Sequence, residues 1–439
     1  MELIELTEEE FEQFALSSDQ VSFHQTKQWG HLKETNGWDM HLIGLKDDEK
    51  VVAASLLLSK KLPIVKGRMF YSPRGFLIDY SNYELLKTWT SEIKKYVKKN
   101  NGIFIKIDPY VSYQERDLLG NVVPNGKNNK EGFNNLKKLG YKHFGFNLMQ
   151  EELQPRWIFV TDVYGKTVEE LMKDMDPKTR QILRKNERDM IKCREIGYDE
   201  LDKFKDIMQH TGDRRNFIDR PLKYYQDMYN YLGKDGILKI LIAELNLAEL
   251  IGEIDKEISE LDKEYKEKQA KYNSDPSKMN KDKYEKSQKQ IQDNIERLNK
   301  KKEHELKLKE EHGNILTLGG ILFLIYGDEV LSLVGGSYDK YMEFQSAYTV
   351  HFEGMKMALN GGYKRYNFYG ITGVFDEKNP LFGLYSFKRD FGGKVVELLG
   401  EFDLVVNKFM YVVYKVSFKC YHFLKSIKFK ITKLFKGGK

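Results

Sequence analysis

The 439-residue sequence has little of what disulfide-linked, metal-binding or membrane-spanning proteins need. Its two cysteines, Cys193 and Cys420, cannot build a disulfide framework, and they favour a reducing compartment. Its nine histidines are scattered without the spacing of metal ligands, so we expect no metal site. It has no run of about 18 apolar residues, and its acidic N-terminus has no apolar signal core. We therefore expect a cytoplasmic protein with no membrane span.

The chain is long and mildly basic. Its length is enough for more than one hydrophobic core, so we expect two or three domains. A hydrophobic fraction of 41% and a charged fraction of 31% are normal for a globular protein with an additional charged segment. The net charge of +6 is too small to indicate a nucleic-acid partner by itself, so the distribution of the charge along the chain matters more.

The most distinctive stretch lies near the C-terminal end and reads RYNFYGITG, DEKNP and GLYSFKRDFGG. Its first piece predicts a short aromatic strand that ends at Gly370. Lys388 follows among aromatic residues, directly after Phe387. A lysine in these surroundings can place a fixed positive charge in a semi-dry cleft, which suits a negative oxygen that develops during acyl transfer. The alternative is a half-buried hairpin whose lysine reaches out to solvent.

Two further segments carry carboxylate and guanidinium groups at predicted turns. Asp108 follows a buried strand predicted at Ile103–Ile107, and its carboxylate either takes part in catalysis or caps the next turn. Arg74 lies in a turn that Pro73 and Gly75 fix, where it either binds a ligand or holds the turn.

Helical patterns carry the other charged and aromatic candidates. Trp29 and Lys33 lie four residues apart on one face of a predicted helix, as do Arg220 and Tyr224. From the pattern alone, Trp29 and Tyr224 are core aromatic residues, Lys33 is a solvated lysine, and Arg220 caps a helix. The segment Glu169–Arg194 predicts a basic helix, capped by Asp176 or Thr179, whose cationic face either holds RNA phosphates or is simply solvated. That face carries Arg180, Arg184 and Lys185.

Residues 247–311 and 404–439 differ from the rest of the chain. In the first segment apolar residues recur every three or four positions on both sides of Pro276, which predicts an antiparallel coiled-coil hairpin. The second segment has nine lysines and no acidic residue, with apolar residues at helical spacing. It predicts a basic amphipathic helix on the anionic inner leaflet of the cell membrane, or a helix packed on the protein.

The segments RYNFYGITG and GLYSFKRDFGG together resemble the C-terminal signature of the Fem family of peptidoglycan-bridge aminoacyltransferases. The pieces QTKQW, TRQILRK and TGDRRNFIDRPLKYY resemble other patterns of that family. MFYSPRGFLIDY resembles the FYxPRGPxxDY segment of one of its branches, except that Phe76 replaces the second proline. Two tyrosines that many relatives carry before the GGS loop are Ser332 and Val334 here, so that part of the family's substrate contact is in question.

The resemblance implies an α+β fold with two GNAT-like α/β domains, an inserted antiparallel coiled-coil hairpin and the C-terminal basic amphipathic helix. Residues 1–150 would form the first domain, to which about 398–403 return. Residues 151–246 and 312–397 would form the second domain, 247–311 the hairpin and 404–439 the membrane-surface tail. We find no clear Q/R-x-x-G-x-G/A loop of the kind that acetyl-transferring relatives use for coenzyme A, which argues against an acyl-CoA donor.

The resemblance also implies a reaction without a cofactor, in which alanine, serine or glycine moves from aminoacyl-tRNA to the stem-peptide lysine amine of lipid II. Lys388 would stabilise the tetrahedral oxyanion, with Phe387 and Tyr369 as walls around it. Asp108 would orient or deprotonate the amine. The other residues assigned in this way are Trp29, Lys33, Arg74, Arg220 and Tyr224 for the lipid-linked substrate and Arg180, Arg184 and Lys185 for tRNA.

Two alternative functions remain at this point. One is a membrane-associated scaffold of cell-wall synthesis without catalytic activity, and the other is an aminoacyl-tRNA transferase with a different acceptor. The hairpin has three alternatives of its own, because it could contact tRNA, pair two copies of the chain as a homodimer, or serve the fold alone.

Overall fold

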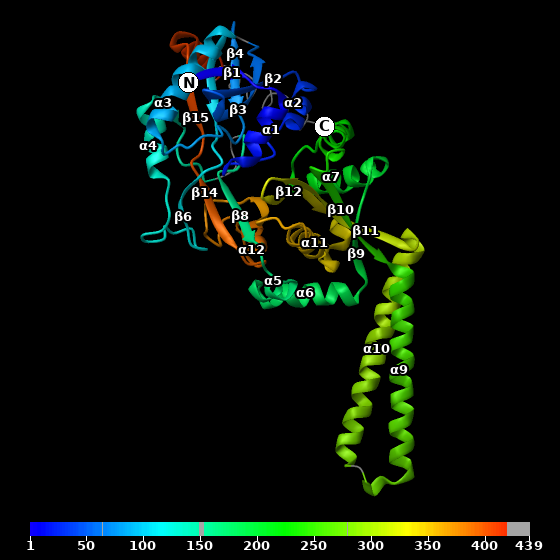
Figure 1. Cartoon of the computed structure of the whole chain (residues 1–439). Helices are drawn as coiled ribbons and strands as arrows, with labels where there is room; N and C mark the ends of the chain where they lie inside the picture. Colours follow the sequence, from blue (N-terminus) through cyan, green and yellow to red (C-terminus); the bar gives the residue numbers. More distant parts are fainter. Residues whose placement is uncertain (64, 149–152, 279, 419–439) are drawn as a thin grey trace, which may run out of the picture.

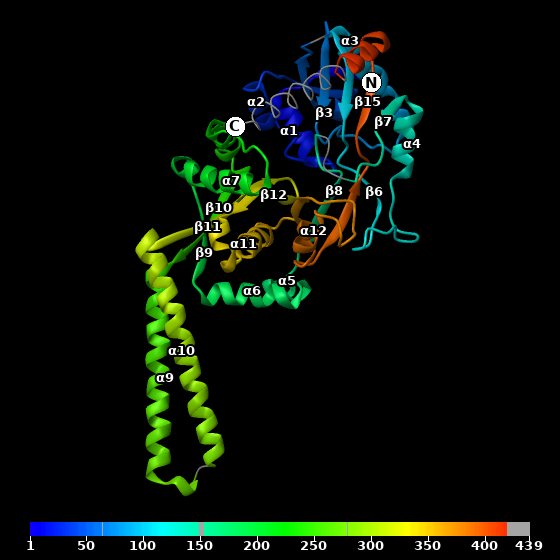
Figure 2. The same ribbon diagram turned by 180° about the vertical axis from the view of Figure 1, so that it is seen from behind.

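The computed structural model describes residues 1–418 except 64, 149–152 and 279. It contains two large β-sheets, each covered by helices, and a long helical hairpin that extends away from the second sheet (Figures 1 and 2). The expected α+β class with more than one core is confirmed. Each sheet is antiparallel except for one parallel pair, and a helix lies in the connection between the two strands of that pair, as a parallel connection requires.

The first sheet has seven strands. In their order across the sheet they are β1 (Glu2–Glu5), β2 (Asp39–Asp47), β3 (Lys50–Lys61), β4 (Arg68–Ser72), β5 (Gly102–Ile107), β15 (Phe402–Val405) and β7 (Tyr141–His143). Its helices are α1 (Glu8–Ser17), α2 (Lys27–Glu34), α3 (Tyr83–Lys99) and α4 (Lys130–Lys138). Thr7 and Glu10 form a reciprocal capping box at the start of α1, as their spacing predicts.

The second sheet has eight strands. In order they are β6 (Ser112–Glu115), β14 (Lys394–Leu398), β8 (Trp157–Asp162), β13 (Arg365–Gly370), β12 (Glu329–Ser337), β11 (Ile315–Tyr326), β10 (Leu238–Asn246) and β9 (Ile191–Glu195). Its helices are α5 (Val168–Asp174), α6 (Pro177–Arg188), α7 (Leu201–Arg215), α8 (Leu222–Met228), α11 (Ser346–Asn360) and α12 (Phe382–Arg389). Short 3-10 or π turns are η1 (Tyr198–Glu200), η2 (Tyr229–Gly233), η3 (Pro276–Lys278) and η4 (Asp339–Phe344).

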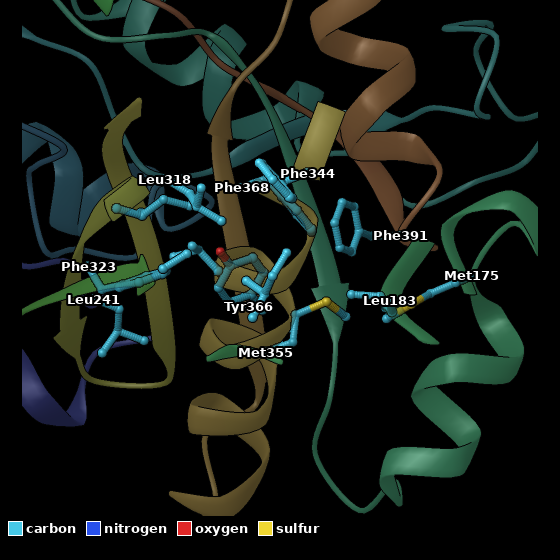
Figure 3. Packing of buried hydrophobic residues seen from close by; sticks show 14 of the residues in the cluster. Met175, Leu183, Leu241, Leu318, Phe323, Phe344, Met355, Tyr366, Phe368 and Phe391 are labelled. Carbon is cyan, nitrogen blue, oxygen red and sulfur yellow. The ribbon is translucent and has the colours of Figure 1, made fainter. Parts of the chain in front are cut away.

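The core of the second domain fills the space between the sheet and α11. Tyr366 and Phe368 of β13 pack edge to face with their ring centroids 4.7 Å apart, and Phe391 lies 5.2 Å from Phe368 (Figure 3). Met355 of α11 closes this aromatic group from the side. Full burial of each such side chain stabilises the fold by roughly 1.5–3 kcal/mol. The core therefore holds β13, which carries functional candidates, in a fixed position.

The helical hairpin consists of α9 (Leu247–Ser274) and α10 (Lys281–His312), which lie side by side along their length (Figure 1). Asn246 and Asn280 cap their first turns through side-chain oxygens. Near the far end Tyr272 stacks on Tyr284 with ring centroids 4.1 Å apart. Pro276 lies in the turn between the helices, where the missing N–H is tolerated.

The structure corrects the sequence prediction in two segments. The helix predicted at Glu169–Arg194 ends at Arg188, because the chain turns at Met190 with φ of +62° and continues as β9. The stretch around Lys388 forms α12 rather than a hairpin, since Phe382, Tyr385 and Lys388 recur at helical spacing. A two-residue turn at Gly327–Asp328 joins β11 and β12.

The predicted tail is described only in part. Residues 404–405 belong to β15, residues 408–418 form a helix, and 419–439 lie outside the described residues. Of the helices that the structure describes, none has the length and apolar character that a membrane crossing requires.

Four connections of the chain cross between the sheets. They run from β5 to β6, from β6 to β7, from β7 to β8 and from β14 to β15. At these crossings buried Glu397 accepts hydrogen bonds from Arg116 (2.6 Å) and Arg156, and Lys106 donates to Glu401 (2.9 Å). Breaking a buried ion pair typically costs about 3–5 kcal/mol, so these contacts resist any shift of the crossings.

Candidate active site at the domain junction

A small cavity of about 10 Å³ lies where the β5–β6, β7–β8 and β14–β15 connections run between the sheets. Arg74 follows β4, Asp108 follows β5, and Glu401 lies between β14 and β15, so three strand ends meet there. The remaining lining residues are Pro109, Gly145, Asn147, Gln154, Arg156, Leu398 and Gly400. The junction thus gathers residues that are far apart in the sequence around one cavity.

Asp108 and Arg74 form the buried charged pair of this pocket. The backbone N–H of Arg74 donates to Asp108 Oδ1 at 2.8 Å, and Arg74 Nη1 lies 3.8 Å from Asp108 Oδ2. Arg74 Nη2 donates to the carbonyl of Pro155 at 3.0 Å. Burial raises the pKa of Asp108 to about 7, against the opposing charge of Arg74. Asp108 thus holds the turn at Arg74, and its carboxyl group exchanges a proton near neutral pH, as a general base requires.

Tyr369 of the second domain does not line the pocket but contacts Gln154, which does. Its backbone has φ of +63°, and its N–H donates to Asn367 Oδ1 at 2.8 Å. Its hydroxyl donates to Gln154 Oε1, and Arg74 lies near enough to lower its pKa. Burial is the larger effect and raises the pKa of Tyr369 to about 12, so the phenol stays protonated.

Lys388 lies behind β13 and does not line the pocket. Its Nζ donates to the carbonyls of Phe368 and Gly370, both at 2.7 Å, and 7% of the residue is exposed. Burial lowers the pKa of Lys388 to about 7. Phe387 packs against His351 with ring centroids 5.4 Å apart and does not contact the pocket. The expected semi-dry cleft around the ammonium is instead an enclosed contact with two carbonyls, because α12 packs its buried face on β13.

A second group of candidates meets between α2 and the start of α8. Lys33 Nζ lies 4.0 Å from the centroid of the Trp29 ring, and the Arg220 guanidinium lies 5.4 Å from the Tyr224 ring. Within the described residues, neither cation has a carboxylate within 4 Å. Burial, together with the charge of Arg220, lowers the pKa of Lys33 to about 8.

This second group lies close to the pocket. The charges of both Arg74 and Lys33 lower the pKa of His24, which burial has already lowered. His24 is 2% exposed, and its ring centroid lies 5.0 Å from that of Trp29. Two adjacent cations without a carboxylate partner are the arrangement expected of a site for an anion such as a diphosphate.

The three basic candidates of α6 separate into two kinds. Arg180 Nη1 donates to the carbonyls of Lys173 (3.0 Å) and Met175 (2.7 Å), so it caps the end of α5. Arg184 and Lys185 are exposed. Helices α5 and α6 lie at the edge of the second domain, away from the first domain in both views (Figures 1 and 2). The structure does not bring this face to the pocket.

Sequence reasoning missed a network that joins the two domains beside the pocket. The Tyr110 hydroxyl donates to Glu329 Oε2 at 3.0 Å and accepts from Asn367 Nδ2 at 2.8 Å. Arg365 Nε donates to the same Glu329 oxygen at 2.9 Å. Arg365 and Asn367 stand in the RYNFYG strand, but nothing in their spacing indicates the partner Glu329. As for a metal, the described residues contain no group of three or more His, Cys, Asp or Glu able to hold one.

Comparisons with known proteins agree on one family. A family model described as the FemAB family matches residues 6–419. Aminoacyltransferase FemA of Staphylococcus aureus strain bovine RF122 / ET3-1 is 32% identical over 416 residues, which cover 94% of this chain and 97% of that protein. FemA of strain N315 gives the same values. A crystal structure of FemX matches with a TM-score of 0.80 and 27% identity, covering 94% of this chain and 99% of that one.

We predict that anion binding at Lys33 weakens as the pH rises through about 8. The pKa of Lys33 is lowered from its ordinary value, so its charge is present below about pH 8 and lost above it. Calorimetric titration with UDP-glucose, a diphosphate diester whose phosphates keep their charge in this range, should show a rising Kd. Lys33→Arg should remove that rise, and Lys61→Arg, at an exposed site, should not. A wild-type Kd that is constant between about pH 7 and 9 would contradict the assignment.

Proposed function

Since the chain belongs to the FemAB family and is an aminoacyltransferase, we propose that it transfers alanine, serine or glycine from aminoacyl-tRNA to the lysine amine of the stem peptide of lipid II. The product extends the interpeptide bridge of peptidoglycan. The observation that carries this proposal is a buried carboxyl group, Asp108, at the domain junction, close to two cations, Lys33 and Arg220, that have no carboxylate within 4 Å among the described residues. Such a junction suits an acceptor with an amine at one end and a diphosphate at the other.

The chemical step is attack of the neutral amine on the ester carbonyl of aminoacyl-tRNA. The new C–N bond forms, the ester C–O bond breaks, and the tRNA ribose oxygen leaves as a hydroxyl group with the proton that the amine gives up. Asp108 orients the amine and takes its proton, since its pKa of about 7 leaves a large ionised fraction at neutral pH. Holding both reactants in near-attack geometry supplies about 7–11 kcal/mol in favourable cases. Stabilisation of the tetrahedral oxyanion depends on Lys388, with Phe387 and Tyr369 as its neighbours.

The lipid-linked substrate is held by the second group of candidates. Lys33 and Arg220 contact the diphosphate, the Tyr224 ring flanks the sugar, and Trp29, which is 6% exposed, supports Lys33 from the core. Arg74 lies in the wall of the pocket, and its positive charge attracts the negatively charged substrate. The tRNA phosphates meet the exposed Arg184 and Lys185, and Arg180 orders the helix that presents them.

The helix at residues 408–418 favours contact with a membrane surface. Tyr411 packs into the first domain, and its hydroxyl donates to Asp403 at 2.7 Å. On the other side Phe409, Val412 and Val416 are 74%, 60% and 57% exposed. Their spacing of three and four residues puts them on one face. We propose that this face and the lysines of the tail lie on the anionic inner leaflet, where lipid II is anchored.

The transfer itself is tested with radiolabelled alanyl-, seryl- and glycyl-tRNA and lipid II. We expect label in the lipid with one of the three donors. Lys388→Met should lower turnover about 100-fold, in the range seen when a stabilising donor is lost from an oxyanion site, while the protein stays folded by circular dichroism. Unlabelled lipid in the presence of wild-type protein would contradict lipid II as the acceptor, and label in another added acceptor would identify the alternative. Turnover of Lys388→Met close to wild type would refute the role of Lys388.

Membrane contact is tested by cosedimentation with vesicles. Replacing Phe409, Val412 and Val416 with serine should weaken binding to vesicles that contain anionic lipid by at least about tenfold, because each fully buried apolar side chain contributes roughly 1.5–3 kcal/mol. Leu16→Ser, at a site on α1 that is 52% exposed, is the matched control and should bind as wild type. Equal binding of the triple variant and the wild type would rule out this face as the membrane contact.

A further inference from the structure

The turn at Tyr369 is the strained element nearest to the pocket. A tyrosine with φ of +63° occupies the left-handed region, which costs a residue with a Cβ roughly 1–2 kcal/mol. The register between β13 and β8 shifts between Asn367 and Gly370, so the strand is irregular at this point. Such strain persists only where contacts with surrounding residues hold the backbone in place, and it is common at functional sites.

Three hydrogen bonds hold this turn. Lys388 Nζ donates to the carbonyls on both sides of Tyr369, those of Phe368 and Gly370, at 2.7 Å each. Asn367 Oδ1 accepts from the N–H of Tyr369 at 2.8 Å, and its amide nitrogen is fixed in turn by Tyr110 at 2.8 Å. The turn is therefore clamped from α12 on one side and from the interdomain network on the other.

The clamp determines where the neighbouring side chains go. Phe368 stays in the aromatic core beside Phe391 (Figure 3). The Tyr369 hydroxyl reaches Gln154, which lines the pocket, and lies close to Arg74. An ordinary extended residue at this position would need different backbone angles and would direct its side chain elsewhere.

We propose that Lys388 is a positioning residue, which fixes the turn so that the Tyr369 hydroxyl exchanges its hydrogen bond to Gln154 for one to the acyl oxygen of the bound substrate. The inference rests on the proposed function and specifies how the oxyanion is stabilised: by a neutral phenol from Tyr369, with Lys388 acting through it. No bond is broken at either residue. Because the pKa of Tyr369 is raised to about 12, the phenol remains a donor throughout the working pH range.

This arrangement makes the protonation state of Lys388 unimportant for turnover. A neutral amine still has two N–H groups for the two carbonyls. The titratable neighbours are His351 on α11, whose pKa is lowered to about 3, and Tyr366 and Tyr369 on β13, so none of them titrates near pH 7. Turnover of the wild type should therefore not fall as the pH rises from about 6.5 to 8.5. A fall centred near pH 7 would overturn the proposal, because it would show that the charge of Lys388 acts directly.

The position of the turn can be measured without an activity assay. 3-Fluorotyrosine placed at position 369 should give one ¹⁹F resonance, which Lys388→Met shifts or broadens. Lys378→Met, at an exposed site in the same part of the chain, is the matched control and should leave the resonance unchanged. An unchanged resonance in Lys388→Met would overturn the clamp. Should Lys388→Met not fold, Lys388→Gln serves, since its amide still reaches one carbonyl and should shift the resonance by less.

The functional link is tested by a double-mutant cycle on kcat. If Lys388 acts through the Tyr369 hydroxyl, Lys388→Met should cost less than about threefold once Tyr369→Phe has removed that hydroxyl. If the loss of kcat in the double variant equals the product of the losses in the two single variants, the proposal is overturned. The KM for lipid II should change far less than kcat in both single variants. If the wild type shows no transfer, the proposed function is wrong, but the clamp is not thereby tested. The ¹⁹F result would still decide whether Lys388 holds the turn.

Discussion

Incomplete solvation of charge at the domain junction is the constraint on which this site depends. Burial is the largest influence on Asp108 and Lys33, and it moves the pKa of each toward neutrality, to about 7 and 8. An acid and an amine with such pKa values exchange protons near physiological pH, which ordinary aspartate and lysine side chains do not. The proposed base at the junction is Asp108, and the lowered pKa of Lys33 limits the charge on that side chain when the pH is high.

The site exists only when both domains are in place, because each contributes part of it. Arg74 and Asp108 come from strand ends of the first sheet, and Tyr369 comes from β13 of the second. The exchange of β6 and β15 between the sheets ties these pieces together, and the hydrogen bonds of Tyr110 across the junction add to this.

Local patterns in the sequence predicted most of the elements but not how the pieces meet. The spacing of Trp29 and Lys33 placed both on one face of a helix, and the aromatic strand before Gly370 was also predictable. That Lys33 meets Arg220 depends on α2 packing beside the second domain, which no local pattern encodes. The carbonyl partners of Lys388 depend on the left-handed turn at Tyr369, and a tyrosine gives no signal for such a turn. The end of the basic helix was missed for the same reason, since Met190 also has positive φ.

The most direct test of the central claim is the pH dependence of kcat/KM for lipid II in the wild type and in Asp108→Asn. The pKa of Asp108 is raised, so its basic form appears only as the pH passes about 7. The account predicts that kcat/KM rises through a midpoint near pH 7 in the wild type, and that Asp108→Asn is slower and lacks this rise. The same rising limb in Asp108→Asn, with activity close to wild type, would contradict the assignment of Asp108 as the base at this junction.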